Sequence, residues 1–369
     1  MKYKRMPIEI ESPEQLGYDT IECNLAESSI HDALFKDLQL NLNELILCYG
    51  HHLGKPELRE FIASEYTDIS AEDILITAGA AAALFIAATS LLSSKDHLIV
   101  VRPNYATNIE TPRAIGCEID FIDLNFETDF QLNVPLIQSL IKPNTKCISI
   151  TTPHNPTGTV ISEQTLLELI EAAELNNCFL LVDETYRDLT AGIKLPLAAS
   201  LSPNVISVSS VSKAFGLPGI RIGWLITQNK KLQELFLAAK EQIFLCNSIV
   251  DEEIAYQFLQ KKKSFLPAVH QKVKTNFELV KIWMDQNPNL EWVEPQGGVI
   301  CFPRIKKEII VNTELFYSTL YNNYKTLVGP GHWFEMDKRF MRIGYGWPDK
   351  ESLNKGLFNI SAALNETIR

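Results

Sequence analysis

The chain has 369 residues, of which 46% are apolar, and it carries a formal net charge of -11. The length is too great for one ordinary core and indicates two domains, or one large domain with a smaller companion. The negative charge argues against nonspecific binding to nucleic acid, because such binding depends on Lys and Arg side chains that neutralise phosphates.

The cysteines and the apolar segments indicate the cellular compartment in which the protein is expected. The seven cysteines are scattered and include no CxxC pair, so neither a disulfide framework nor a zinc site is expected. The N-terminal "MKYKRMPIEIESPEQ" has basic residues but no apolar run after them, unlike a signal peptide. No apolar stretch reaches the roughly 20 residues that a membrane span needs. We therefore expect a cytoplasmic protein.

The middle of the chain alternates short apolar runs with amphipathic stretches. Because most runs are continuously apolar, they favour strands that are covered on both faces of a mostly parallel sheet. In the helix predicted at 162–177, Leu166, Leu169 and Ile170 share one face. Ser162 is its expected N-cap. The alternation predicts an α/β sheet with crossover helices. The predicted strands are 97–101, 117–122, 147–151, 179–183, 205–209 and 221–226, and another helix is predicted at 79–94.

After about residue 265 the pattern changes to that of a smaller α+β domain. A long helix is predicted there, followed by short strands and a final helix. The predicted elements are a helix at 267–287, strands near 291–293, 299–303 and 340–344, and a helix near 350–365. The expected parts are an irregular N-terminal segment at 1–40 that packs on the small domain and the active site, a large domain at 41–264, and a small domain at 265–369.

Two polar motifs follow predicted buried strands. "LLVDETY" places Asp183 at the carboxyl end of a strand, with Tyr186 three residues later. In open α/β sheets, ligands bind at that end, although a carboxylate that caps a helix is the alternative for Asp183. "TTPHNPTGT" holds Asn155 in a sharp turn, where bonding to its own backbone is the simpler role.

Two further motifs suit an anion. "TAGAAAALF" leads from a glycine into a helix, so the N–H groups at 79–81 are free to bind one. "SSVSKAFGLPGIRIGW" places Ser210 and Arg221, both good phosphate ligands, on either side of Lys213. A lysine beside such cations and partly removed from water has a lowered pKa and becomes a usable nucleophile. A loop lysine that points into water is the simpler alternative.

In this order, the motifs resemble the aspartate-aminotransferase superfamily, the fold-type I enzymes that use pyridoxal 5′-phosphate (PLP), and within it the class I and II aminotransferases. The resemblance covers roughly residues 45–350 and rests on "NPTG", "VDETY" and "SVSKAFGLPGIRIGW". It implies a large domain with a mostly parallel mixed sheet sandwiched by helices, and a smaller α+β domain. It also implies a homodimer in which Tyr49, in "CYGHHLGKPELREFIA", reaches the phosphate of the neighbouring subunit.

The resemblance implies roles for the cofactor-binding residues. Lys213 matches the lysine that forms the Schiff base (the internal aldimine) with PLP and moves the substrate proton. Asp183 matches the carboxylate that pairs with the pyridine nitrogen, which keeps the ring a good electron sink. Asn155 and Tyr186 match the groups that hydrogen-bond the 3′-oxygen. The other implied cofactor contacts are Gly79, Ala80, Ala81, Ser210 and Arg221 around the phosphate, Tyr105 stacked on the ring, and Tyr49 of the neighbouring subunit.

The resemblance also implies how the substrate is held. Arg342, in "KRFMRIGYG", matches the arginine that binds the α-carboxylate, with Arg339 as the neighbouring alternative. "NLAESS" replaces a glycine-containing stretch that closes over the substrate, and its Ala26 and Glu27 are expected to shape an unusual specificity. His332 and Trp333 are expected near the mouth of the pocket, and the roles of His51 and His52 stay open.

The expected reaction is the exchange of an amino group between an L-α-amino acid and a 2-oxo acid, without a metal, nucleic-acid or membrane partner. Lyases, decarboxylases, cyclases and oxidases of the same fold stay open, because the reaction depends on which Cα bond lies perpendicular to the ring. A PLP-binding regulator is disfavoured, since no basic DNA-binding module precedes the domain.

Overall fold

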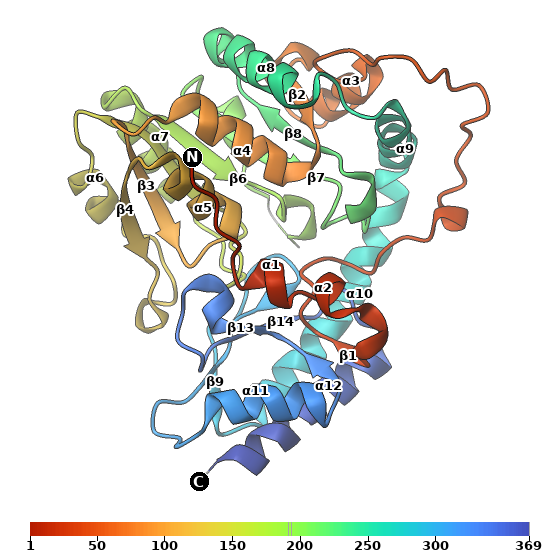
Figure 1. Cartoon of the computed structure of the whole chain (residues 1–369), viewed down its shortest axis with the longest axis vertical. Helices are drawn as coiled ribbons and strands as arrows, with labels where there is room; N and C mark the ends of the chain where they lie inside the picture. Colours follow the sequence, from red (N-terminus) through yellow and green to blue (C-terminus); the bar gives the residue numbers. More distant parts are fainter. Residues whose placement is uncertain (191, 193, 369) are drawn as a thin grey trace.

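The computed structural model describes residues 1–190, 192 and 194–368. A seven-stranded sheet forms the centre of the larger part of the molecule, in the order β2-β8-β7-β6-β5-β3-β4 (Figure 1). Strands β3 to β7 pair in parallel, whereas β8 runs antiparallel to both β2 and β7. The expected mostly parallel mixed sheet is therefore confirmed. The strands are β2 (Ile74–Thr77), β3 (His97–Arg102), β4 (Glu118–Asp123), β5 (Thr145–Thr151), β6 (Phe179–Asp183), β7 (Val205–Ser210) and β8 (Gly223–Ile226).

The continuous apolar runs are explained by cores on both faces of this sheet. In β6, Leu180 and Val182 join one buried cluster and Leu181 joins the other, because successive side chains of a strand point to opposite faces. Helices α4 (Gly79–Leu91) and α8 (Lys230–Phe244) supply the second cluster, and α7 (Glu163–Leu175) packs into the first. The Ser162 side chain accepts a hydrogen bond from the backbone of α7, so the predicted N-cap is confirmed.

Several predicted boundaries differ from the structure, and two of the differences have a clear cause. The strand expected at 221–226 begins only at Gly223, because a 3-10 turn (Pro218–Ile220) and a left-handed Arg221 (φ 47°) redirect the chain first. Helix α10 spans Lys262–Asp285 rather than beginning at Pro267. A proline in the second turn removes one backbone hydrogen bond without ending the helix. The elements that were not predicted include β2, α3 (Pro56–Ser64), α5 (Ala106–Ile115), α6 (Val134–Ser139), α8 and α9 (Ile249–Leu259).

The smaller part of the molecule lies at the other end of α10 (Figure 1). Its short strands form a three-stranded sheet, β10-β14-β13, and a β11-β9 pair. Helices α11 (Thr313–Asn322) and α12 (Lys350–Thr367) pack together there. The strands are β9 (Leu290–Glu291), β10 (Ile300–Cys301), β11 (Arg304–Ile305), β13 (Gly329–Pro330) and β14 (Met341–Gly344).

The N-terminal segment is attached to this smaller part. Strand β1 (Cys23–Asn24) pairs in parallel with β12 (Thr326–Leu327). The segment is less irregular than predicted, since it contains the short helices α1 (Ile8–Glu11) and α2 (Pro13–Leu16). Figure 1 shows both helices between the large sheet and the smaller part. Across the described residues, no helix has the length and apolar character that crossing a membrane requires.

Candidate active site

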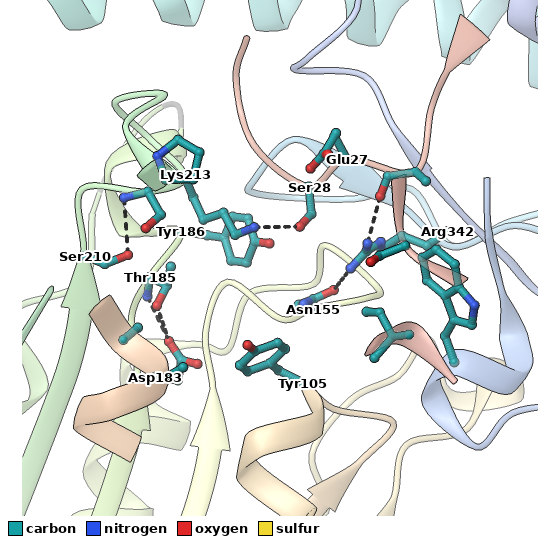
Figure 2. A pocket seen from close by; sticks show the side chains of 18 of the residues that line it. Glu27, Ser28, Tyr105, Asn155, Asp183, Thr185, Tyr186, Ser210, Lys213 and Arg342 are labelled. Atoms are coloured by element: carbon teal, nitrogen blue, oxygen red, sulfur yellow. Dashed lines mark hydrogen bonds between the residues drawn. The ribbon is translucent and has the colours of Figure 1, made fainter. Parts of the chain in front are cut away.

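The carboxyl ends of three neighbouring strands meet at one edge of the large sheet. Thr151 at the end of β5 lies opposite Asp183 at the end of β6, and β7 ends beside them at Ser210. Parallel strands place these ends together, so residues far apart in the chain share one site. A cavity of about 330 Å³ opens at this edge (Figure 2).

Lys213 lies on the wall of this cavity, three residues after β7 ends. Its Nζ donates a hydrogen bond to Ser28 Oγ at 3.1 Å (Figure 2). Burial lowers the pKa of Lys213, and the charge of Glu27 opposes that shift. Because desolvation disfavours the ammonium form, the amine is available as a nucleophile and as a base at a lower pH than a lysine in water. The loop lysine in solvent is thereby excluded.

Asp183 is a buried carboxylate, and its hydrogen bonds to Thr185 both involve the same oxygen, Oδ1. Its Oδ1 accepts hydrogen bonds from the Thr185 backbone N–H at 3.0 Å and from Thr185 Oγ1 at 2.6 Å. Burial raises the pKa of Asp183, while the bonds from Thr185 oppose the shift. A buried carboxylate needs a positive partner, and a protonated ring nitrogen in the cavity would supply one.

The start of α4 and the side chain of Arg221 form an anion site. The N-cap residue Ala78 makes no side-chain capping bond, so the first N–H groups of the helix are open. Gly79 has a φ of +83°, and a Cβ there would lie 2.5 Å from Arg221 Nη2. Glycine therefore lets the guanidinium lie against the helix start. Ser210 Oγ accepts from the Ser212 backbone N–H at 3.3 Å and faces the same cavity.

Arg342, on β14, lies across the cavity from these groups. Its Nη1 donates to Asn155 Oδ1 at 3.0 Å, and its Nη2 donates to the Ala26 carbonyl at 2.8 Å (Figure 2). Its Nε has no partner among the residues that the structure describes, although the side chain is buried. Tyr186 Oη is also buried without such a partner, and burial raises the pKa of Tyr186 to about 12. Buried donors of this kind are ordinarily paired, so both fit a ligand in the cavity.

The structure brings most of the predicted site residues to this one cavity. Gly79 lies just beneath Arg221, while Tyr49 lies outside and 83% of it is exposed. Trp333 reaches the cavity wall and donates from Nε1 to Glu11 Oε2 at 2.7 Å. The residues that line the cavity as predicted are Ala26, Ala80, Ala81, Tyr105, Asn155, Asp183, Tyr186, Ser210, Lys213, Arg221 and Arg342.

Several other candidates lie elsewhere. Arg339, the alternative to Arg342, lies outside the cavity, and its Nη1 donates to the carbonyls of Lys306 and Ile309 at 2.8 and 3.0 Å. It thus has a structural role, and of these two neighbouring arginines Arg342 is the one that lines the cavity. Of the three histidines with open roles, His332 bonds Glu11, His52 bonds Glu241, and His51 accepts from the Leu53 backbone N–H.

Sequence reasoning missed several residues of the cavity wall, among them Thr185, Ser28, Glu9 and Glu14. Thr185 follows Asp183 within "VDETY", and its spacing is that of a hydroxyl that bonds a nearby carboxylate. Ser28 lies within "NLAESS", but nothing in that motif places it on Lys213. Glu9 and Glu14 also line the cavity and belong to α1 and α2, a segment without a helical or strand pattern.

Comparisons with known proteins agree with this geometry. The family described as aminotransferase class I and II matches residues 24–356. Capreomycidine synthase of Streptomyces vinaceus is 26% identical over 95% of this chain and 92% of its own length. An aspartate aminotransferase of Pyrococcus horikoshii is 27% identical over 86% of this chain and 83% of its own. A solved PLP-dependent aminotransferase from Streptococcus suis matches with a TM-score of 0.92 and 27% identity, covering 100% of both chains.

Proposed function

Since the chain belongs to the class I and II aminotransferase family, we propose that it is a PLP-dependent aminotransferase that moves an amino group between an L-α-amino acid and a 2-oxo acid. The observation that carries the proposal is the pairing of Lys213 with Arg342 across one cavity. One is a buried amine that reacts with carbonyls, and the other is a guanidinium with a free buried donor. An amino acid needs both groups, one for its Cα and one for its carboxylate.

PLP is the cofactor of this family, and the residues present fit it. The uncapped start of α4, Ser210 and Arg221 suit its phosphate, and the buried Asp183 suits its ring nitrogen. The free Tyr186 hydroxyl suits an oxygen on the ring. When bound, PLP supplies the electron sink that accepts the electron pair left on Cα when a bond there breaks.

In this proposal Lys213 also moves the substrate proton. Its Nζ, whose pKa burial lowers, accepts the proton from Cα and returns it to a neighbouring carbon. The Ser28 hydroxyl, 3.1 Å away, fixes where the amine points. Positioning of this kind matters because proton transfer requires the base within hydrogen-bond reach of the proton.

Arg342 orients the substrate for that transfer. Its Nη1 and Nη2 are held by Asn155 and the Ala26 carbonyl, so the planar guanidinium cannot rotate. A guanidinium fixed in this way holds a carboxylate in one orientation and thereby sets which Cα bond faces the ring. Residues of the N-terminal segment, among them Ser12 and Pro13, line one side of the cavity.

One comparison favours a second candidate reaction. Capreomycidine synthase matches 95% of this chain at 26% identity, about the same identity as the aspartate aminotransferase. The alternative is therefore a cyclase or another PLP-dependent lyase, decarboxylase or oxidase of amino acids. The same wall residues would hold PLP in either case.

A single-turnover screen separates the two reactions. PLP-loaded protein is mixed with each L-amino acid in the absence of any 2-oxo acid, and products are identified by mass spectrometry. The proposal expects one 2-oxo acid per active site, together with pyridoxamine 5′-phosphate. Release of carbon dioxide, ammonia or a cyclic amino acid, with PLP regenerated, would overturn it.

We further propose that the protein works as a homodimer with shared active sites. The support is an exposed apolar stretch at 46–49, in which Leu47 is 78% exposed and Tyr49 is 83% exposed. Such side chains on one short segment are typical of a surface covered by another chain. Light scattering of the purified protein should give twice the mass of the chain, and Tyr49→Ala should weaken PLP retention.

A further inference from the structure

The cavity has an acidic wall, which we define as Glu9, Glu14 and Glu27. All three line the cavity, on the side formed by the N-terminal segment. None of them forms an ion pair with a residue in the described part of the chain. Burial raises the pKa of Glu9, and so does the charge of Glu14, because the two negative charges repel each other. A cation placed among them would relieve that repulsion.

The cations of the cavity are already engaged by the common parts of the ligands. Lys213 reacts with the carbonyl, Arg221 faces the phosphate site, and Arg342 binds the α-carboxylate in the proposed function. Among the described lining residues no fourth Lys or Arg remains for a second carboxylate on the substrate. The cavity therefore has no free cation for an acidic substrate side chain, but it has carboxylates that can bind a basic one.

Independent groups in the cavity also indicate a ligand next to this wall. Arg342 Nε and Tyr186 Oη are both buried, both lack a partner among the described residues, and both lie on the cavity. Figure 2 shows Glu27 above Arg342 and Ser28, on the side of the cavity opposite Asp183. A substrate held by Arg342 thus has Glu27 within the same half of the cavity.

Glu27 is held in place but keeps one oxygen free. Its Oε1 accepts from Tyr18 Oη at 3.0 Å, and no other bond to the side chain is formed by a described residue. The backbone on one side of Glu27 accepts from Arg342, through the Ala26 carbonyl, and Ser28 on the other side accepts from Lys213. Glu27 is therefore fixed between the carboxylate anchor and the reactive amine.

We propose that the substrate is an amino acid with a basic side chain, and that Glu27 binds its guanidinium or ammonium group. The inference rests on the proposed function for the placement of the α-carboxylate at Arg342. Tyr18 is a positioning residue that holds Glu27 Oε1, which leaves Oε2 for the substrate. Glu9 and Glu14 add negative charge at the mouth of the cavity and draw the cation in.

The test compares L-arginine with L-citrulline on the PLP-loaded protein. The two have nearly the same shape, but citrulline replaces the guanidinium with a neutral urea group. The first spectral change of bound PLP on mixing, followed by stopped flow, reports binding whichever bond breaks later. Wild-type protein should bind arginine roughly tenfold to a hundredfold more tightly, the range for a charge-assisted hydrogen bond.

Variants assign the preference to Glu27. Glu27→Gln should remove most of the preference for arginine while leaving citrulline binding nearly unchanged. Tyr18→Phe should reduce the preference for arginine by a smaller factor. The control Glu171→Gln, an exposed position on α7, should retain the full preference. Equal binding of the two amino acids by the wild type, or equal weakening of both by Glu27→Gln, would overturn the inference.

The same samples distinguish this inference from the proposed function. Preferential binding of arginine without formation of a 2-oxo acid would contradict transamination but support the basic side chain. Conversely, 2-oxo acid made equally well from citrulline would support transamination and overturn the role of Glu27.

Discussion

The two walls of the cavity are built in different ways. One wall consists of strand ends and a helix start in the large sheet and carries Asp183, Ser210, Lys213 and Arg221. The other comes from the N-terminal segment, with short helices and a loop that carry the acidic wall. The sheet wall holds the groups that suit PLP in the proposed function. The N-terminal wall holds the carboxylates to which we assign the choice of substrate.

The difference has a physical origin. Strand ends are fixed by the hydrogen bonds of the sheet and by cores on both faces, so they place catalytic atoms with little freedom. The N-terminal segment has one two-residue strand pairing, β1 with β12, and is otherwise held by individual bonds such as those of Glu11 with His332 and Trp333. The sequence of such a segment can change without disturbing the sheet. Substrate specificity can therefore vary most easily in this segment.

The largest effect should come from the centre of the sheet wall. Lys213→Ala removes the amine that reacts with PLP and moves the proton, so turnover should fall by about 10³-fold or more. The visible absorption of bound PLP should change as well, while phosphate binding partly persists. Lys231→Ala, at an exposed position on α8, is the control. Full activity of Lys213→Ala would invalidate the assignment of the site.

Asp183→Asn should have the next largest effect. The amide keeps the shape and the bonds to Thr185 but cannot hold a positive charge on the ring nitrogen, so the electron sink weakens. We expect turnover to fall by about 10² to 10³-fold, measured as the single-turnover rate with saturating amino acid. An unchanged rate would mean that the buried carboxylate serves only the fold.

Arg342→Lys should act on substrate binding more than on turnover. Lysine keeps the charge but loses the two fixed donors, so KM should rise roughly tenfold to a hundredfold. Arg339→Lys is the matched control, because Arg339 binds backbone carbonyls outside the cavity. A similar KM increase in both variants would show that the effect is structural.

Gly79→Ala tests the phosphate end of the sheet wall. The added Cβ would lie 2.5 Å from Arg221 Nη2 and force the guanidinium away, so PLP affinity should fall by about tenfold. Gly116→Ala is a close control, since Gly116 has a φ of +82° but nothing within 4 Å of the added Cβ. The two glycines have nearly the same positive φ, so weaker PLP binding in Gly79→Ala alone points to the displacement of Arg221.

The smallest expected effect links the two walls. The charge of Glu27 opposes the lowering of the Lys213 pKa by burial, so removing that charge in Glu27→Gln should lower the pKa of Lys213 further. PLP binds covalently through the neutral amine, and the pH midpoint of its recombination with the apoprotein should therefore move to lower pH. A midpoint that moves to higher pH would contradict the placement of Glu27 beside Lys213.

Prediction from sequence succeeded mainly on the sheet wall. Its residues follow apolar runs whose strand character could be recognised, and its motifs occur in the order that the family requires. For the same reason the fold class was predicted, and the bounds of strands β3 to β7 were predicted to within two residues. The start of β8 was not, because the turn at Pro218 and the left-handed Arg221 leave no periodic signal.

The N-terminal wall could not be predicted in the same way. Glu27 was singled out because "NLAESS" departs from the family pattern, but its neighbours Glu9 and Glu14 have no motif. Their position depends on long-range contacts, such as the pairing of β1 with β12 across about 300 residues of chain. The bond between Lys213 and Ser28 likewise joins residues 185 positions apart.

The most direct test of the central claim follows the amino group itself. PLP-loaded protein is given an amino acid with a ¹⁵N-labelled α-amino group together with an unlabelled 2-oxo acid, and the products are analysed by mass spectrometry. The account predicts that the label appears on the amino acid made from the added 2-oxo acid, and that Lys213→Ala transfers none. Label released as ammonium, or retained in a cyclised or decarboxylated donor, would contradict it.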